Sequence, residues 1–262
     1  MALAVCACSQ VPLTGRSQLL LVSDAEVAEL SRQSRTKFLQ EADREGKIVR
    51  AQDPDGATVV PMVERVSSRI IRAAGLERHA QWRVIVVRAN QVNANASADG
   101  TIVVYTGILP VTQTEAGLAV VVGHEVAHVV ARHSGERLSQ VVVAQNLSNL
   151  AAALASPQYQ GAVGAALGLG AQYGVLLPFS RKHELEADHL GLYYMAKAGY
   201  DPAEAPRLWE RMSAKGGGGG TPEFLSTHPS DATRIARLRE LLPDARRYYE
   251  NPTLPLPAAT GR

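Results

Sequence analysis

Apolar positions repeat with helical spacing in several segments of the chain and with strand character in two. Over residues 59–74 the apolar side chains fall on one face of a helix. Residues 82–88 and 101–106 are rich in β-branched side chains and predict strands, and the Asp99–Gly100 turn between them predicts an antiparallel pair. The pattern therefore predicts an α+β chain, mostly helical, with one small antiparallel sheet. Further helices are expected at about 23–44, 114–133, 181–198, 203–214 and 231–242.

The same pattern divides the chain into three parts. Residues 1–22 read as an extended lead-in, 23–249 as a single domain and 250–262 as an irregular, proline-rich tail. Within the domain, residues 141–177 are apolar but rich in glycine and alanine, so helices near the active site are favoured over a membrane span, with contact to a membrane surface left open. The glycine run at 216–220 predicts a surface loop.

Composition narrows the class of protein. The net charge is +2, and lysine and arginine are interleaved with acidic residues, so no nucleic acid partner is expected. The only cysteines are Cys6 and Cys8, so the rest of the chain can form no disulfide and no thiolate metal site. Any metal ion must be held by histidine and carboxylate side chains.

The segment from His124 to His128 carries the strongest chemical signal. Residues four apart on a helix share a face, so His124 and His128 can reach one zinc ion, and Glu125 beside them can take a proton from an attacking water. The alternative is a surface helix with two solvated histidines. The valines on both sides make the helix apolar on most faces, and buried histidine and glutamate are costly unless they are paired or bind metal. The segment therefore predicts a site for one Zn²⁺.

A third zinc ligand is expected from the predicted helix at 181–198. Glu184 and Asp188 are four residues apart and share a face, whereas Glu186 points away by about 200° and is expected to face solvent. Glu184 is assigned as the ligand, and Asp188 as the acceptor of a hydrogen bond from a ligand imidazole. The alternative is an ordinary charged helical face.

The remaining histidines show no ligand pattern. His133 lies nine residues after His124, about 180° around the helix, and is not expected to bind the metal. His79 and His189 are expected at the surface, and no role is assigned to His183.

Several segments together match the pattern of a known family. They are Asn93-Ala94, Gly100 to Gly107, His124 to His128, Ser180-Arg181, Glu184 to Asp188, Thr227 to Pro229 and Arg234-Ile235. In these segments the chain resembles the HtpX and CAAX-prenyl-protease family of zinc metallopeptidases. Within that family it is most similar to the bacterial periplasmic lipoprotein branch, which includes the beta-barrel assembly-enhancing proteases, and to the mitochondrial inner-membrane stress proteases. The resemblance implies a gluzincin fold and endopeptidase activity, with Glu125 as the catalytic base.

The resemblance also implies roles for residues outside the ligand set. It places His228 near the open zinc position, where it could stabilise the oxyanion, bind the metal as an inhibitory fourth ligand, or only order its turn; the inhibitory role is favoured. Arg234 is expected to pair with Asp188. An edge strand is expected to bind extended substrates through its main chain, although residues 95–99 depart from the family pattern. Its substrate-binding residues are Asn93, Ala94, Asn95 and Ala96.

The expected function is hydrolysis of misfolded or unassembled proteins of the bacterial cell envelope. The short apolar start that ends at Cys8 resembles the end of a lipoprotein signal, so Cys8 is the predicted lipidation site, and the predicted location is the periplasm, anchored to the outer membrane. The alternatives are an envelope chaperone or assembly factor with latent protease activity, and a membrane-embedded prenyl protease, which the lack of clear membrane spans disfavours.

Overall fold

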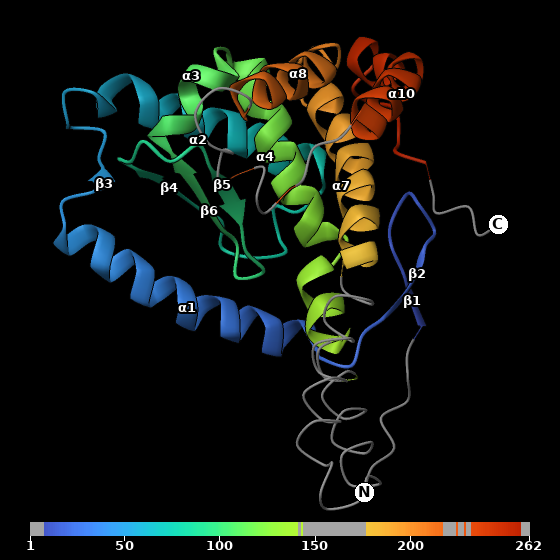
Figure 1. Ribbon diagram of the computed structural model, residues 1–262, viewed down its shortest axis with the longest axis horizontal. Helices are drawn as coiled ribbons and strands as arrows, with labels where there is room; N and C mark the ends of the chain where they lie inside the picture. Colours follow the sequence, from blue (N-terminus) through green and yellow to red (C-terminus); the bar gives the residue numbers. More distant parts are fainter. Residues whose placement is uncertain are drawn as a thin grey trace, which may run out of the picture.

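The computed structural model describes residues 8–140, 143, 177–216, 224, 228 and 232–257. Figure 1 shows helices gathered around a small sheet, with a short hairpin on the outer side. The predicted class, α+β and mostly helical, is confirmed. The strands are β1 (Cys8–Gln10), β2 (Ser17–Leu19), β3 (Ile48–Val49), β4 (Arg83–Val87), β5 (Ala94–Ala96) and β6 (Thr101–Tyr105). The helices are α1 (Asp24–Arg44), α2 (Gly56–Ala73), η1 (Thr106–Ile108, 3-10), α3 (Leu109–Thr112), α4 (Glu115–Val130), α7 (Leu177–Lys197), α8 (Glu204–Gly216) and α10 (Ala232–Glu250).

The main sheet has the strand order β3-β4-β6-β5, and its pairing differs from the prediction. β4 and β6 are parallel, with Arg83 opposite Thr101, so they do not form the expected hairpin. The Asp99–Gly100 turn instead connects β6 to β5, its antiparallel neighbour. β5 lies within the segment where an edge strand was expected, although its alanines and asparagine have little strand propensity. Its position at the sheet edge agrees with the expected edge strand.

α4 and α7 lie side by side in the centre of the molecule (Figure 1). Their contact is made by backbone, at Gly123 and Gly191. A Cβ atom on Gly191 would lie 2.7 Å from the amide nitrogen of His124 and 2.8 Å from the carbonyl carbon of Gly123. Only glycine allows this approach, and it brings the turn of α4 that carries His124 directly against α7.

The amphipathic face predicted for α2 is buried as expected, since Val63, Val66 and Ile70 are fully inaccessible to solvent. The last helix is longer than predicted and continues past Pro243 to Glu250. Its apolar face continues through Ala245 and Tyr248, both buried, and this packing outweighs the hydrogen bond that proline cannot donate.

The predicted lead-in forms a folded hairpin, made of β1 and β2, that lies beside α7 (Figure 1). The amide of Val11 donates to the carbonyl of Arg16 at 2.9 Å, and Gly15 adopts a φ of 65° in the turn. The side chain of Val11 is fully buried, so the hairpin belongs to the packed body of the protein.

Two predicted segments lie outside the described residues. One is the apolar region 141–177, of which the structure describes only positions 143 and 177; the other is the glycine run, of which only Gly216, the last residue of α8, is described. Among the described helices, none is both long enough and apolar enough to cross a membrane.

Candidate active site

Four side chains from three parts of the chain converge at the contact between α4 and α7. His124 and His128 come from α4, Glu184 from α7 and His228 from the segment before α10. One nitrogen or oxygen atom from each lies within 4.8 Å of the others. The structure thus brings together the two predicted histidine ligands, the predicted glutamate ligand and His228.

The spacing of these atoms fits a single tetrahedral metal ion. Nε2 of His124 lies 3.0 Å from Nε2 of His128 and 3.1 Å from Oε2 of Glu184. Nδ1 of His228 lies 3.3 Å from Nε2 of His124 and 3.0 Å from Oε2 of Glu184. Ligands about 2.0–2.1 Å from zinc in a tetrahedron are separated by about 3.3 Å. The donor set and its dimensions are therefore those of a histidine–carboxylate zinc site.

The ring nitrogens that face away from the cluster also have partners. Nδ1 of His124 lies 2.9 Å from Oδ1 of Asp188, and Nε2 of His228 lies 3.3 Å from Oε1 of Glu125. Nδ1 of His128 lies 2.8 Å from Nδ1 of His133. For His124 and His128, a hydrogen bond at the remote nitrogen fixes the ring and leaves the other nitrogen free to bind metal.

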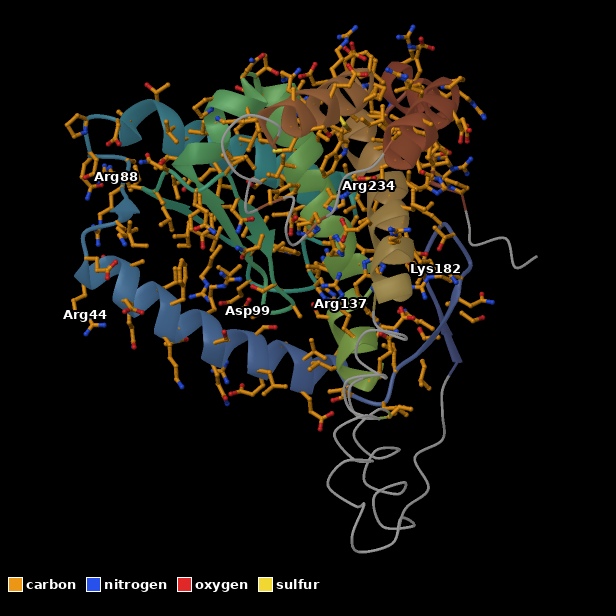
Figure 2. All side chains as sticks on the ribbon, viewed as in Figure 1. Arg44, Arg88, Asp99, Arg137, Lys182 and Arg234 are labelled. Atoms are coloured by element: carbon orange, nitrogen blue, oxygen red, sulfur yellow. The ribbon has the colours of Figure 1, made fainter. Side chains whose placement is uncertain are left out.

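Asp188 is itself held by Arg234, as predicted. The guanidinium Nε donates to Oδ2 of Asp188 at 2.6 Å, and Nη2 donates to Oδ1 at 2.7 Å. Nη1 of Arg234 donates to the main-chain oxygen of His228 at 3.3 Å. Figure 2 shows Arg234 where α10 meets the α4–α7 pair, so one buried cation links the ligand helix to the His228 segment.

The electrostatics of the cluster show how strongly its members interact. Burial lowers the pKa of His124, but hydrogen bonds to Asp188 and Glu184 outweigh this effect and raise it to about 9. Burial would raise the pKa of Glu184, yet hydrogen bonds to His124 and His228 hold it far below its ordinary value. Burial and the neighbouring His124 lower the pKa of His128. A cation in the centre would replace these interactions between the ligands.

Glu125 lies between the cluster and the edge strand. Its Oε2 accepts a hydrogen bond from the amide of Ala96 in β5 at 3.3 Å, and burial raises the pKa of its carboxyl. The carboxyl is 3% exposed, so it faces the interior of the site. The structure therefore places the predicted base next to the predicted substrate strand.

The predicted exposure of Glu186 is wrong. Glu186 is buried, and its carboxylate contacts Arg16, Thr14 and His133. The helical phase was correct, because Glu186 does lie on the face opposite Glu184. That face is covered by the N-terminal hairpin, from more than 160 residues earlier in the chain, which no local pattern indicates.

His133 is also a site residue that the sequence reasoning missed. The helical phase was measured along one continuous helix to residue 133, whereas α4 ends at Val130 and Arg132 has a φ of 54°. The turn directs His133 back to His128. His79 is exposed as expected, whereas His189 is partly buried.

A helix with two histidine ligands and a glutamate base, completed by a glutamate from a second helix, defines the gluzincin class of metallopeptidases. The sequence model of peptidase family M48 matches residues 59–242, which include all of these residues. The chain therefore belongs to peptidase family M48, and the predicted resemblance is confirmed.

Individual relatives support the same assignment. The chain is 43% identical over 184 residues to the mitochondrial metalloendopeptidase OMA1 of Schizosaccharomyces pombe, covering 70% of this chain and 53% of that protein. It is 28% identical over 254 residues to the human mitochondrial metalloendopeptidase OMA1, covering 91% and 47%. It is 28% identical over 165 residues to the beta-barrel assembly-enhancing protease of Escherichia coli, covering 60% and 34%. The chain thus spans about half the length of these mitochondrial relatives.

These comparisons contradict the predicted location in the bacterial periplasm at the outer membrane. Proteins named as mitochondrial, from fission yeast and Arabidopsis thaliana, are 43% and 40% identical to this chain, whereas the beta-barrel assembly-enhancing protease of Escherichia coli is 28% identical. The location had been inferred from the short apolar start that ends at Cys8, of which the structure describes only Cys8 itself, as the first residue of β1. Lipidation of Cys8 stays a prediction that these observations do not test.

Proposed function

We propose that this chain is a zinc-dependent endopeptidase, and that His124, His128 and Glu184 hold one zinc ion. The observation that carries the proposal is the convergence of the ligand atoms of these residues, with Glu125 beside them. Membership of the M48 family and the metalloendopeptidases among its relatives support it.

The bound zinc would polarise the scissile carbonyl and make water a stronger nucleophile. The carboxylate of Glu125 takes a proton from the attacking water and then gives it to the leaving amine, so the base is regenerated in each turnover. The raised pKa of this buried carboxyl makes it a better proton acceptor than an exposed glutamate. Asp188 and Arg234 keep the ring of His124 in place.

We further propose that substrates bind as extended chains along β5, with Asn93, Ala94, Asn95 and Ala96 as the contact residues. β5 is an edge strand, and the amide of Ala96 reaches Glu125, so a peptide paired with this edge would pass in front of the base. A cavity of about 590 Å³ beside the edge is lined by Ala96, Ala98 and His128, and on the hairpin side by Pro12 and Leu13.

Main-chain pairing depends little on side-chain sequence, which suits a protease of misfolded or unassembled proteins. The beta-barrel assembly-enhancing proteases among its relatives are named for a link to protein assembly. We therefore propose protein quality control as the biological role.

Removing the metal tests the activity. Zinc-loaded protein is expected to cleave unfolded casein, to lose this activity after dialysis against 1,10-phenanthroline, and to regain it when zinc is added back. The metal content should be measured by elemental analysis at each step. Casein cleavage that continues in protein shown to contain no metal would contradict the proposal.

His228 is proposed as an inhibitory fourth ligand, because its Nδ1 faces the cluster and would close a site that catalysis needs open. His228→Ala is expected to retain zinc through the other three residues and to have a higher kcat on casein. An oxyanion role would instead make kcat about 100–1,000-fold lower. His189→Asn, which alters a histidine outside the ligand cluster, is the control. Unchanged kcat and unchanged zinc affinity would leave His228 only the role of ordering its turn.

A further inference from the structure

The hydrogen-bond partner of His128 differs in kind from that of His124. His124 contacts a carboxylate directly, whereas Nδ1 of His128 lies 2.8 Å from Nδ1 of His133, another imidazole. His133 is 1% exposed, so no solvent competes for this contact. The orientation of one metal ligand therefore depends on what holds His133.

His133 is held by a buried network that ends on the N-terminal hairpin. Its Nε2 lies 2.9 Å from Oε2 of Glu186, which accepts a second hydrogen bond from Nε of Arg16, also at 2.9 Å. The two Nη atoms of Arg16 donate to the carboxylate of Glu136 at 2.8 and 2.7 Å. Glu136 lies 3.1 Å from Nε2 of His183, whose ring stacks on that of His133 with centroids 4.2 Å apart.

One assignment of protons gives every contact between the hairpin and the metal site a donor and an acceptor. Nε2 of His128 must be unprotonated to bind a metal, so its Nδ1 carries the proton and donates a hydrogen bond to Nδ1 of His133. Nε2 of His133 then carries a proton and donates to Glu186. The negative charge on Glu186 is balanced by Arg16.

The two carboxylates are surrounded by donors and by one cation in this buried setting. Glu186 accepts hydrogen bonds from His133, Arg16 and Thr14, and the guanidinium of Arg16 lies against it. Burial would raise the pKa of Glu136, but the adjacent His183 imidazole and the hydrogen bonds from Arg16 lower it to about 2. Without the guanidinium, two carboxylates would be left close together without a cation, which is strongly unfavourable.

We propose that Arg16 is a positioning residue for the metal site, which acts through Glu186 and His133 to orient His128. The inference rests on the proposed zinc site and deepens it. The hairpin formed by β1 and β2 would then help to orient a metal ligand. Among the described residues, no other residue places a cation against both Glu186 and Glu136.

Zinc affinity separates this proposal from a purely structural role for the network. The dissociation constant should be measured by competition with a chromophoric chelator for Arg16→Met, His133→Leu and Glu186→Gln, and the melting temperature of each metal-free variant recorded beside it. Loss of a group that orients a metal ligand typically weakens binding about 10–100-fold, and this range is expected for His133→Leu. Arg16→Met and Glu186→Gln are also expected to raise the dissociation constant for zinc. His133→Gln, whose amide can accept from His128 and donate to Glu186, should recover part of the affinity.

Arg211→Met is the matched control, because Arg211 is also a part-buried arginine that pairs with a glutamate and with main-chain oxygens, but of α8 and α3. It is expected to lower the melting temperature without changing the zinc affinity. Should Arg16→Met not fold, Arg16→Lys keeps the charge but loses the forked contact, and His133→Leu still tests the path.

The outcomes are distinct. Variants of the network that melt at lower temperature but bind zinc as tightly as the unmodified chain would overturn the proposal and leave the zinc site intact. An equal loss of affinity in Arg211→Met would overturn it too, because general destabilisation would then explain the effect. An unmodified chain that binds no zinc would overturn the proposed metal site itself.

Discussion

Glu125→Gln is expected to bind zinc as tightly as the unmodified chain and to hydrolyse casein about 100–10,000-fold more slowly. Glutamine has the shape of glutamate and can still accept from the amide of Ala96, so the site should keep its geometry. It cannot take a proton from water at neutral pH. Elemental analysis and kcat should be measured on the same preparation.

The contrast between metal content and turnover is what identifies the base. Cleavage within tenfold of the unmodified rate would remove Glu125 from that role and favour another proton acceptor. The same variant distinguishes an enzyme from a chaperone with latent activity. If the chain acts as a chaperone, Glu125→Gln should suppress the aggregation of an unfolded protein as well as the unmodified chain does.

Glu184→Ala is expected to weaken zinc binding more than 100-fold, beyond the range typical of residues that only orient a ligand. Its carboxylate lies 3.1 Å from Nε2 of His124 and 3.5 Å from Nε2 of His128, and among the described residues it is the carboxylate that belongs to the cluster. Competition with a chelator gives the dissociation constant. Glu184→Gln should be measured beside it, since it preserves the packing.

Two other glutamates provide the comparison. Glu210→Gln, an exposed partner of Arg239, should leave zinc affinity unchanged, whereas Glu186→Gln should show the smaller loss expected of an orienting residue. If Glu184→Ala instead binds zinc with unchanged affinity, His228 becomes the third protein ligand and the proposed inhibitory role fails.

The sequence allows the centre of this site to be predicted because the information is local. His124 and His128 are four residues apart on one helix, as are Glu184 and Asp188 on another, so helical geometry alone places each pair on one face. The pairing of Asp188 with Arg234 could also be anticipated, once the family resemblance placed the last helix near the site.

What could not be predicted depends on contacts between distant segments. The phase of Glu186 was correct, but only the folded chain shows that Arg16 covers it. His133 was misplaced because a turn after Val130, with Arg132 at positive φ, interrupts the periodicity. The parallel pairing of β4 with β6 was missed because β5, three residues of low strand propensity, occupies the place of the expected partner.

The contact between Gly123 and Gly191 has a consequence for engineering this enzyme. Because the two ligand helices meet through their backbones at these residues, their approach leaves no room for a side chain. Volume-conserving substitutions elsewhere in the core, which are tolerated best, should be absorbed by side-chain repacking and leave this approach and the metal ligands in place. A stabilised variant could therefore be built around an unaltered catalytic centre, provided that these two glycines are kept.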